Sequence, residues 1–172
     1  ARAHLTAHYE RHAGTLNWYC LDFWASELAL DIMQLKEEVV HLIAVRPDVP
    51  AFLWALRESG RRVVMVTNAH PKSLDLKMRE TGIDAYFDAL ISSHQVGLPK
   101  EHPDFWQGLQ TIEPFDRQRT LFVDDSLPVL KSAQAYGIAH LLAVCNPDSK
   151  QPHKDCGEFM AITSFEGVMP DV

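Results

Sequence analysis

The sequence has few cysteines and no long apolar run. Only three of its 172 residues are cysteines (Cys20, Cys145 and Cys156), and no two of them form a CxxC pair. This odd, scattered set predicts a reducing compartment without a disulfide framework, and we expect a cytoplasmic protein. No apolar stretch approaches about 18 residues, and no leader peptide is visible, so neither a membrane span nor a signal peptide is predicted.

Basic residues are also scarce. The chain has 16 Lys and Arg against 23 Asp and Glu, a formal net charge of −7. A general nucleic-acid binder needs a basic face, so a nucleic-acid polymer is not expected as a partner. A small anionic metabolite is compatible with this charge, because a bound cation and one or two lysines can set the local field. The oligomeric state is left open.

The apolar fraction of 47% is that of a folded protein with a sizeable core. The first part of the chain has helical spacing of its apolar residues, over residues 5–11, 16–30 and 32–45. We therefore predict a helical cap subdomain over residues 1–48.

The pattern changes after a short amphipathic helix at residues 49–58, which Gly60 is placed to end. Short apolar strands then alternate with helices. The predicted strands are residues 62–66, 89–93, 120–123 and 140–144, and the predicted helices are residues 71–80, 103–111 and the segment between Ser126 and Gly137. In the tail we expect a last helix, with Thr163 and Glu166 at capping-box spacing. Such alternation predicts an α/β fold, a doubly wound parallel sheet, over residues 49–172.

Polar side chains follow three of the predicted strands. They are Thr67 and Asn68 after the first strand, Lys100 after the second, and Asp124 and Asp125 after the third. Ligands of a parallel α/β sheet bind beyond the carboxyl ends of its strands. We therefore expect a hydroxyl, an ammonium and two carboxylates to lie along one edge.

The pair Asp124-Asp125 predicts a magnesium site. Two adjacent carboxylates at a partly buried strand end need a compensating cation, and Mg²⁺ takes oxygen ligands. The alternative is that Asp125-Ser126 only starts a helix.

Thr67, Asn68 and Lys100 also have two interpretations each. Thr67-Asn68 can form a simple turn, or it can hold phosphate oxygens at a helix N-terminus. Lys100 can be a solvated lysine, or its ammonium can reach a phosphate and the carboxylates.

Candidates in the cap are less specific. His4, His8 and His12 lie on one helical face, a spacing that can bind zinc or be a solvated face. Aromatic residues such as Trp18 and Tyr19 belong mostly to the cap core, although one or two rings could stack on a base. The other histidines form no nucleophile–base arrangement with a Ser or Cys that the sequence reveals.

The order of these motifs resembles the haloacid dehalogenase-like (HAD) hydrolase superfamily, in its second, third and fourth motifs. The closer similarity is to the bacterial purine 5′-nucleotidase branch that acts on GMP and IMP. It rests on the stretches TLNWYCLDFW (15–24), TNAHP (67–71), GLPKE (97–101), TLFVDDS (120–126) and NPDS (146–149). The resemblance covers essentially the whole chain.

The resemblance implies a Mg²⁺-dependent phosphomonoester hydrolase that works through an aspartyl-phosphate. Thr67 and the backbone around Asn68 would hold phosphate oxygens, and Lys100 would neutralise the phosphate and the nucleophile. Asp124 would bind Mg²⁺, with Asp125 bonding directly or through water. Such roles suit phosphoryl transfer, which depends on positioning and charge stabilisation.

The resemblance also implies where a substrate would be selected, namely in the cap. Asn17, Trp18 and Tyr19 are the candidate substrate-binding residues, and the implied substrate is a purine 5′-mononucleotide.

The first motif of the family, DxDxT, is absent from these residues. In the family it ends a strand between those that carry Thr67 and Asp124, and it supplies the nucleophile. We expect the natural protein to extend upstream by about 30 to 50 residues, one β unit and the start of the cap. The chain as given is then expected to be inactive.

Four alternatives remain open. A response-regulator receiver also uses acids, Thr and Lys around magnesium, but in another order along the chain. Hydrolysis of a carbon–halogen bond occurs in the same superfamily but needs no magnesium. The third is a phosphatase for another small ester, and the fourth is a non-catalytic phosphate-binding relative.

Overall fold

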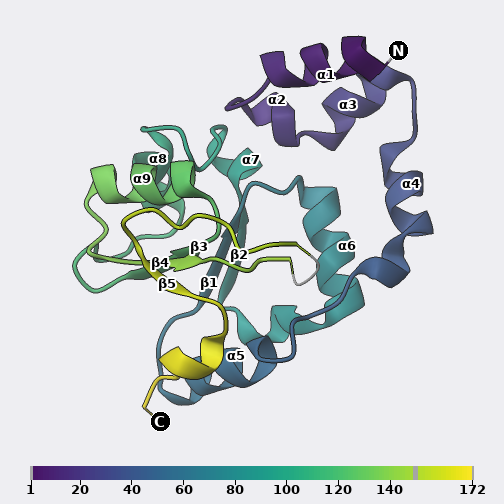
Figure 1. The fold of residues 1–172 in the computed structure, drawn as a ribbon. Helices are drawn as coiled ribbons and strands as arrows, with labels where there is room; N and C mark the ends of the chain where they lie inside the picture. The colour runs from purple at the N-terminus through teal and green to yellow at the C-terminus, as the bar shows by residue number, and fades with distance from the viewer. Residues whose placement is uncertain (1, 149–150, 172) are drawn as a thin grey trace. The chain divides into compact units, whose positions relative to one another are not determined.

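The computed structural model describes residues 2–148 and 151–171, and side chains within helix α1 from residue 6 onward. It divides into two compact units, which are considered one at a time. The first is Ala1–Arg46 with Arg62–Pro99, and the second is Pro47–Arg61 with Lys100–Val172. Figure 1 shows their helices and strands along the chain. The predicted division into a cap (1–48) and a core (49–172) stays a prediction.

The first unit begins with helices. They are α1 (Arg2–Arg11), α2 (Leu16–Tyr19), α3 (Leu21–Leu28), α4 (Ile32–Glu38) and the 3-10 helix η1 (Val40–Leu42). The single helix predicted over residues 16–30 is wrong, because Cys20 interrupts it with an extended backbone (φ −86°, ψ 112°). The helix predicted over residues 32–45 ends early, at Glu38, before the β-branched pair Val39-Val40.

Two parallel strands complete this unit. The elements are β1 (Val64–Thr67), α6 (Pro71–Thr81), the 3-10 helix η2 (Ile83–Tyr86), β2 (Ala89–Ser92) and the short α7 (Ser93–Val96). The register of the pair places Thr67 opposite Ser92, so both strands end at the same level. Gly82 ends α6 in the left-handed region (φ 63°), a conformation that glycine adopts without strain.

The second unit contains a three-stranded sheet. Its elements are α5 (Val49–Glu58), α8 (Phe105–Ile112), β3 (Leu121–Asp124), α9 (Leu127–Tyr136), β4 (His140–Val144), β5 (Met160–Ile162) and the 3-10 helix η3 (Phe165–Val168). All three strands are parallel, in the order β3-β4-β5. The predicted α/β class with parallel strands is confirmed. The described strands form two sheets, one in each unit.

The core of the second unit lies where α8 and α9 meet the sheet. Phe105, Trp106 and Leu130 are at most 1% exposed. The Trp106 ring packs edge-on against Phe122 of β3, with ring centroids 4.8 Å apart, and its Nε1 donates to Ser132 Oγ of α9. This packing holds the carboxyl end of β3, where Asp124 lies.

Some predicted helix ends differ in detail. Helix α8 begins at Phe105, not in the turn that contains Pro103. Ser126 precedes α9 but makes no side-chain cap. The last helix is a single 3-10 turn, and Ser164 caps it by accepting from the Glu166 N–H. No described helix has the length and apolarity that a membrane crossing requires.

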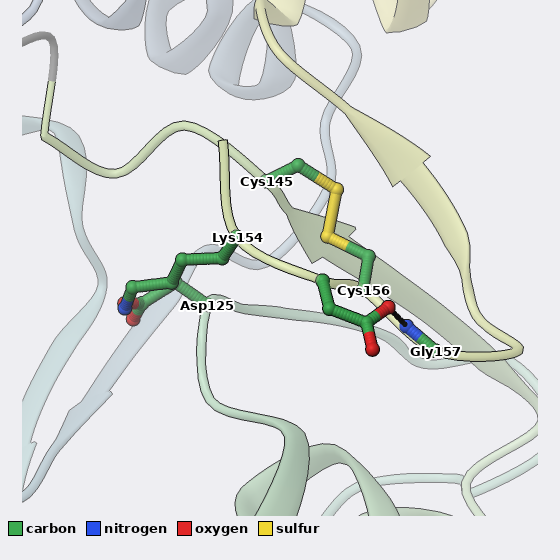
Figure 2. Close-up of a disulfide and its surroundings, with 6 residues drawn as sticks. Asp125, Cys145, Lys154, Cys156 and Gly157 are labelled. Atoms are coloured by element: carbon green, nitrogen blue, oxygen red, sulfur yellow. Dashed lines mark hydrogen bonds and ion pairs between the residues drawn. A yellow bond between two sulfur atoms is a disulfide. The ribbon is translucent and has the colours of Figure 1, made fainter. Parts of the chain in front are cut away.

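The expectation of no disulfide is wrong in this structure. Cys145 and Cys156 are joined, with Cα atoms 5.8 Å apart (Figure 2). Their proximity comes from tertiary structure, because the segment after β4 turns back and Lys154 N–H donates to the Cys145 carbonyl. The sequence shows only an 11-residue separation, which predicts no pairing. The cytoplasmic location stays a prediction.

Candidate active site

Lys100 and Asp124 form a buried ion pair in the second unit. Lys100 Nζ donates to Asp124 Oδ2 at 2.5 Å, and the two side chains are only 10% and 7% exposed. Asp124 is the last residue of β3, and its Oδ1 also accepts from the Ser126 N–H at 2.9 Å. Lys100 Nζ lies 5.6 Å from the centre of the Phe122 ring. The structure therefore brings together two of the predicted site residues, which are 24 positions apart in the sequence.

Asp125 has a different environment. Its Oδ2 accepts from Lys154 Nζ at 2.6 Å, and the side chains are 44% and 52% exposed (Figure 2). Asp124 and Asp125 thus offer oxygen atoms from a buried and an exposed carboxylate at the carboxyl end of β3. Hard oxygen donors of this kind suit Mg²⁺. Both carboxylates are held by ammonium groups here, so a bound cation would take over contacts that lysines now make.

Thr67 and Asn68 lie at the carboxyl end of β1, in the first unit. Both are half-buried, and Thr67 Oγ1 accepts from the Ala69 N–H at 3.0 Å. That bond stabilises the turn leading into α6, so the turn interpretation is satisfied. The phosphate-binding role and the convergence of Thr67 with Lys100 and Asp124 stay predictions.

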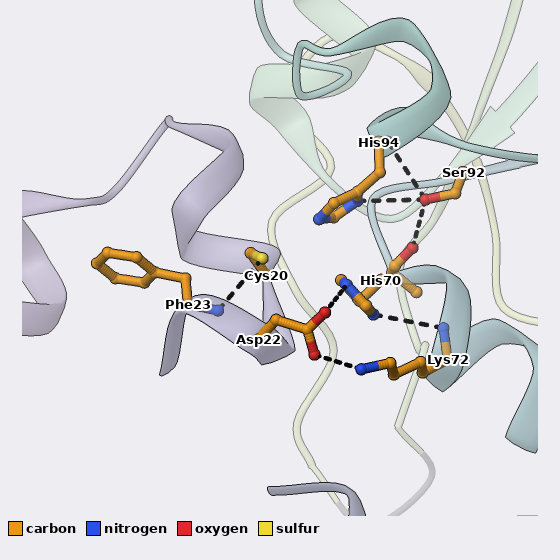
Figure 3. Close-up of polar contacts among 8 residues, drawn as sticks. Cys20, Asp22, Phe23, His70, Lys72, Ser92 and His94 are labelled. Atoms are coloured by element: carbon orange, nitrogen blue, oxygen red, sulfur yellow. Dashed lines mark hydrogen bonds and ion pairs between the residues drawn. The ribbon is translucent and has the colours of Figure 1, made fainter. Parts of the chain in front are cut away.

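The first unit contains a second group of candidate ligand side chains, which sequence reasoning missed. Ligand atoms of Cys20, His70 and His94 all lie within 4.8 Å of one another (Figure 3). The pairing register of β1 and β2 explains why the two histidines lie close together. Because Thr67 is opposite Ser92, the histidines that follow them by three and two residues come to the same edge.

Burial lowers the pKa of both histidines below the usual value of 6.5. For His70 the nearby Asp22 carboxylate partly opposes this shift, and for His94 the neighbouring His70 adds to it. Burial therefore favours the neutral form of both rings. A hydrogen bond from Lys72 lowers the pKa of Asp22, which is ionised beside them.

The predicted substrate-binding residues lie on α2 (Figure 1). Asn17 is exposed, whereas Trp18 and Tyr19 are half-buried. The Trp18 ring lies 3.6 Å from the Tyr9 ring, centre to centre, and the Trp18 carbonyl accepts from Trp24 Nε1. Packing against Tyr9 and Trp24 thus accounts for Trp18, and a substrate role for the three residues stays a prediction.

The histidine face of α1 has structural partners. His8 Nε2 lies 2.8 Å from the carboxylate oxygen Oε2 of Glu27, and the His12 ring packs edge-on against Phe23 and Trp24. The His4 side chain lies outside the described residues, as does Ser149 of the NPDS stretch. These contacts favour packing over zinc binding on this face.

The family model of haloacid dehalogenase-like hydrolases matches residues 6–137. The match includes β1, β2 and β3 together with Thr67, Lys100 and Asp124. The chain belongs to this family.

Curated relatives within the haloacid dehalogenase-like family agree with this assignment. The chain is 37% identical over all 172 residues to the GMP/IMP nucleotidase YrfG of Escherichia coli (strain K12), and it covers 78% of that protein. It is 27% identical over 108 residues to the pyrimidine 5′-nucleotidase YjjG of the same organism, with 60% of this chain and 48% of that protein covered. The resemblance stated from the motifs is confirmed.

Solved structures show the same fold. The HAD phosphatase of Thermococcus onnurineus matches with a TM-score of 0.77 and 25% identity, over 97% of this chain and 77% of that one. The L-2-haloacid dehalogenase of Xanthobacter autotrophicus matches with a TM-score of 0.61 and 16% identity, over 73% of this chain and 59% of that one. Since the chain spans less than two thirds of the dehalogenase, and identity is low, this second likeness concerns the fold alone.

Proposed function

We propose that this chain carries most of the active site of a Mg²⁺-dependent phosphomonoester hydrolase that acts on a purine 5′-mononucleotide such as GMP or IMP. The observation that carries the proposal is the buried contact between Lys100 Nζ and Asp124 Oδ2 at the carboxyl end of β3. A buried ion pair costs desolvation free energy and is weak evidence for stability. Binding of a phosphate and a cation explains the buried Lys100–Asp124 pair better than a contribution to stability does.

Each proposed residue has one task. Lys100 places a positive charge where the phosphate and the attacking carboxylate would meet, which lowers their mutual repulsion. Thr67 Oγ1 and the N–H groups around Asn68 would hold the phosphoryl oxygens ahead of helix α6. Asp124 and Asp125 would hold Mg²⁺, Asp125 directly or through water. The cation supplies charge neutralisation on the phosphoryl oxygens when it is bound.

The exposed pair of Asp125 and Lys154 bears on this assignment. In the proposed site Asp125 turns toward the cation, and Lys154 returns to solvent. An exposed ion pair of this kind contributes little free energy, so exchanging it for a metal contact costs little.

The proposal requires a nucleophile that these 172 residues do not contain. No DxDxT motif occurs in them. We propose that the nucleophilic aspartate, and the second aspartate that protonates the leaving oxygen and later activates water, come from sequence outside this chain. The 172-residue chain by itself is then inactive.

The purine nucleotide is proposed from the similarity to the GMP/IMP nucleotidase. Asn17, Trp18 and Tyr19 on α2 are the residues proposed to recognise it. Weaker similarity to a pyrimidine 5′-nucleotidase keeps another small phosphate ester as the second candidate.

The test is phosphate release by the full-length product of the gene from GMP, IMP, UMP and CMP, with Mg²⁺ and with a chelator. We expect Mg²⁺-dependent turnover, fastest with the two purine nucleotides. Lys100→Met should lower kcat/KM by about 100-fold or more, the effect of removing one preorganised group that stabilises transition-state charge. Lys131→Met is the matched control, since Lys131 is an exposed lysine of α9 in the same unit.

The proposal is wrong if the full-length protein releases phosphate from no monoester, or does so equally well in the chelator. Equal loss in Lys100→Met and Lys131→Met would also remove its basis. Release of halide from haloacetate without metal would favour the carbon–halogen alternative. Unchanged GMP and IMP turnover in Asn17→Ala and Trp18→Ala would reject the proposed recognition by α2.

A further inference from the structure

Cys20, His70 and His94 come from three separate parts of the first unit. Cys20 lies at the break between α2 and α3, His70 precedes α6, and His94 is in α7. Their ligand atoms lie within 4.8 Å of one another, and His70 is only 9% exposed. None of them has a role in the phosphate chemistry proposed above.

The hydrogen bonds of His94 determine where its proton lies. Ser92 Oγ donates its only proton to the Ala69 carbonyl at 2.7 Å. The contact of 3.2 Å between Ser92 Oγ and His94 Nδ1 must therefore be a bond that Nδ1–H donates. The neutral ring then has its lone pair on Nε2.

His94 Nε2 is buried and has no hydrogen-bond partner among the described residues. A buried acceptor without a partner is costly, so such an atom in a native structure needs an explanation. Figure 3 shows that this edge of His94 faces Cys20 and His70. The Ser92 hydroxyl orients the ring through the opposite nitrogen, which is how a protein holds a metal-binding histidine.

Cys20 and His70 can complete the set. Cys20 is the one cysteine outside the disulfide, and its Sγ accepts from the Phe23 N–H at 3.4 Å, a bond that a metal-bound thiolate retains. His70 Nε2 lies 3.6 Å from Asp22 Oδ2. Burial lowers the pKa of both histidines and so favours neutral imidazole, the form that binds metal.

We propose that Cys20, His70 and His94 form a binding site for a zinc-class divalent cation, with the fourth position open to water. One thiolate and two imidazoles suit Zn²⁺ and do not suit Mg²⁺, which takes oxygen. This site is therefore chemically distinct from the proposed magnesium site at Asp124.

The required rearrangement is small. Zn–S bonds of about 2.3 Å and Zn–N bonds of about 2.0–2.1 Å place tetrahedral ligand atoms roughly 3.3–3.6 Å apart. Since the ligand atoms lie within 4.8 Å of one another, each pair must close by about 1.5 Å at most. Binding releases the thiol proton of Cys20 to solvent. Ligation through His70 Nε2 moves its ring proton to Nδ1, which gives up the long 3.3 Å contact with the Lys72 N–H.

The experiment uses Co²⁺ as the probe, on the full chain after removal of metal and without reductant. Because Cys145 and Cys156 are joined, a thiolate-to-cobalt charge-transfer band reports on Cys20. We expect this band to saturate at one equivalent of Co²⁺ and to disappear when Zn²⁺ is added. It should persist in Cys145→Ser/Cys156→Ser, which excludes a contribution from the disulfide cysteines.

Variants separate ligands from neighbours. Cys20→Ser should abolish the band, and His94→Gln should weaken Co²⁺ binding by about 100-fold or more. Ser92→Ala, which removes the group that orients His94, should weaken it by about 10-fold to 100-fold, and Ser92→Thr should restore it. His153→Gln, at an exposed histidine outside the cluster, should bind as the wild-type protein does.

The proposal is overturned if no band forms, if the band survives Cys20→Ser, or if His94→Gln binds Co²⁺ as tightly as wild type. A second measurement uses only the wild-type chain, so its result does not depend on whether a variant folds. One equivalent of Zn²⁺ should slow alkylation of Cys20 in the wild-type chain by at least 10-fold. An unchanged alkylation rate would mean that the cluster serves as a hydrogen-bonding subsite and not as a metal site.

Discussion

Replacing Lys100 with methionine tests whether burial gives the Lys100–Asp124 pair its strength. Methionine keeps most of the length and the apolar stem of lysine but removes the charge. Asp124 then keeps the hydrogen bond from the Ser126 N–H and loses the ammonium 2.5 Å away. A buried carboxylate without its cation destabilises the folded state.

The expected loss in the free energy of unfolding follows from the distance between the two charges and from the burial of both side chains. Two unit charges 2.5 Å apart attract with about 7 kcal/mol at an effective dielectric constant of about 20. Removing Lys100 also removes the cost of burying its ammonium, which offsets part of this loss. We therefore expect Lys100→Met to lower the free energy of unfolding by about 3 kcal/mol, within the range measured for broken buried pairs.

The chain contains a matched control for this variant. Lys154 and Asp125 have nearly the same separation, 2.6 Å, but their side chains are 52% and 44% exposed. Water screens this second pair, so Lys154→Met should lower the free energy of unfolding by less than about 1 kcal/mol. Any difference between the two variants therefore reports on burial and not on the length of the contact.

The assay is urea unfolding at pH 7, followed by circular dichroism and by tryptophan fluorescence. The chain has four tryptophans, and Trp106, which belongs to the same unit as Lys100 and packs on Phe122, contributes to the emission from this region. The double variant Lys100→Met/Asp124→Asn should recover at least half of the free energy of unfolding that Lys100→Met loses, because it no longer buries an unpaired carboxylate charge. Equal, small losses in Lys100→Met and Lys154→Met would refute the reasoning.

Three further predictions concern other parts of the chain. The folded pKa values of His70 and His94 are depressed below 6.5, so the unfolded chain binds more protons than the folded chain below that pH. The contribution of the two histidines to the free energy of unfolding is therefore intact above about pH 6.5. It is lost as the pH falls through their folded pKa values. His70→Gln/His94→Gln should flatten the decline of the urea midpoint between pH 7.5 and pH 5. Gly82→Ala should cost about 1 kcal/mol because φ is +63° there, whereas Gly167→Ala, which has open space and no positive φ, should cost almost nothing in the same unfolding assay. Leu130→Ala should cost about 2–5 kcal/mol in thermal or urea unfolding, because Leu130 is fully buried and a cavity would remain.

Much of the second unit could be predicted from the sequence. The strand at residues 140–144 and the helix that ends at Gly137 were predicted at their observed bounds, since apolar periodicity and glycine caps are local signals. The proximity of Lys100 and Asp124 was also predicted, and the structure pairs them within the second unit. Family resemblance extended this to phosphate chemistry, and the comparisons confirm the family.

Other features depend on contacts between distant residues. The break at Cys20 divides what periodicity predicts as one helix, since the helical pattern continues across it. The Cys145–Cys156 bond requires the segment after β4 to return, and no local pattern marks that return. Sequence reasoning therefore assigned all three cysteines to the same reduced state.

The sequence by itself determined the residue types and their order along the chain. It predicted four of the five described strands, all but β5, and the polar groups that follow three of them. That information is local, because side-chain periodicity and turn chemistry act over a few residues. The tertiary structure decided which of those groups meet and how far each is removed from water. It buried Lys100 with Asp124, left Asp125 with Lys154 in solvent, and gathered Cys20, His70 and His94, because strand register and helix packing set distances that no spacing along the chain encodes.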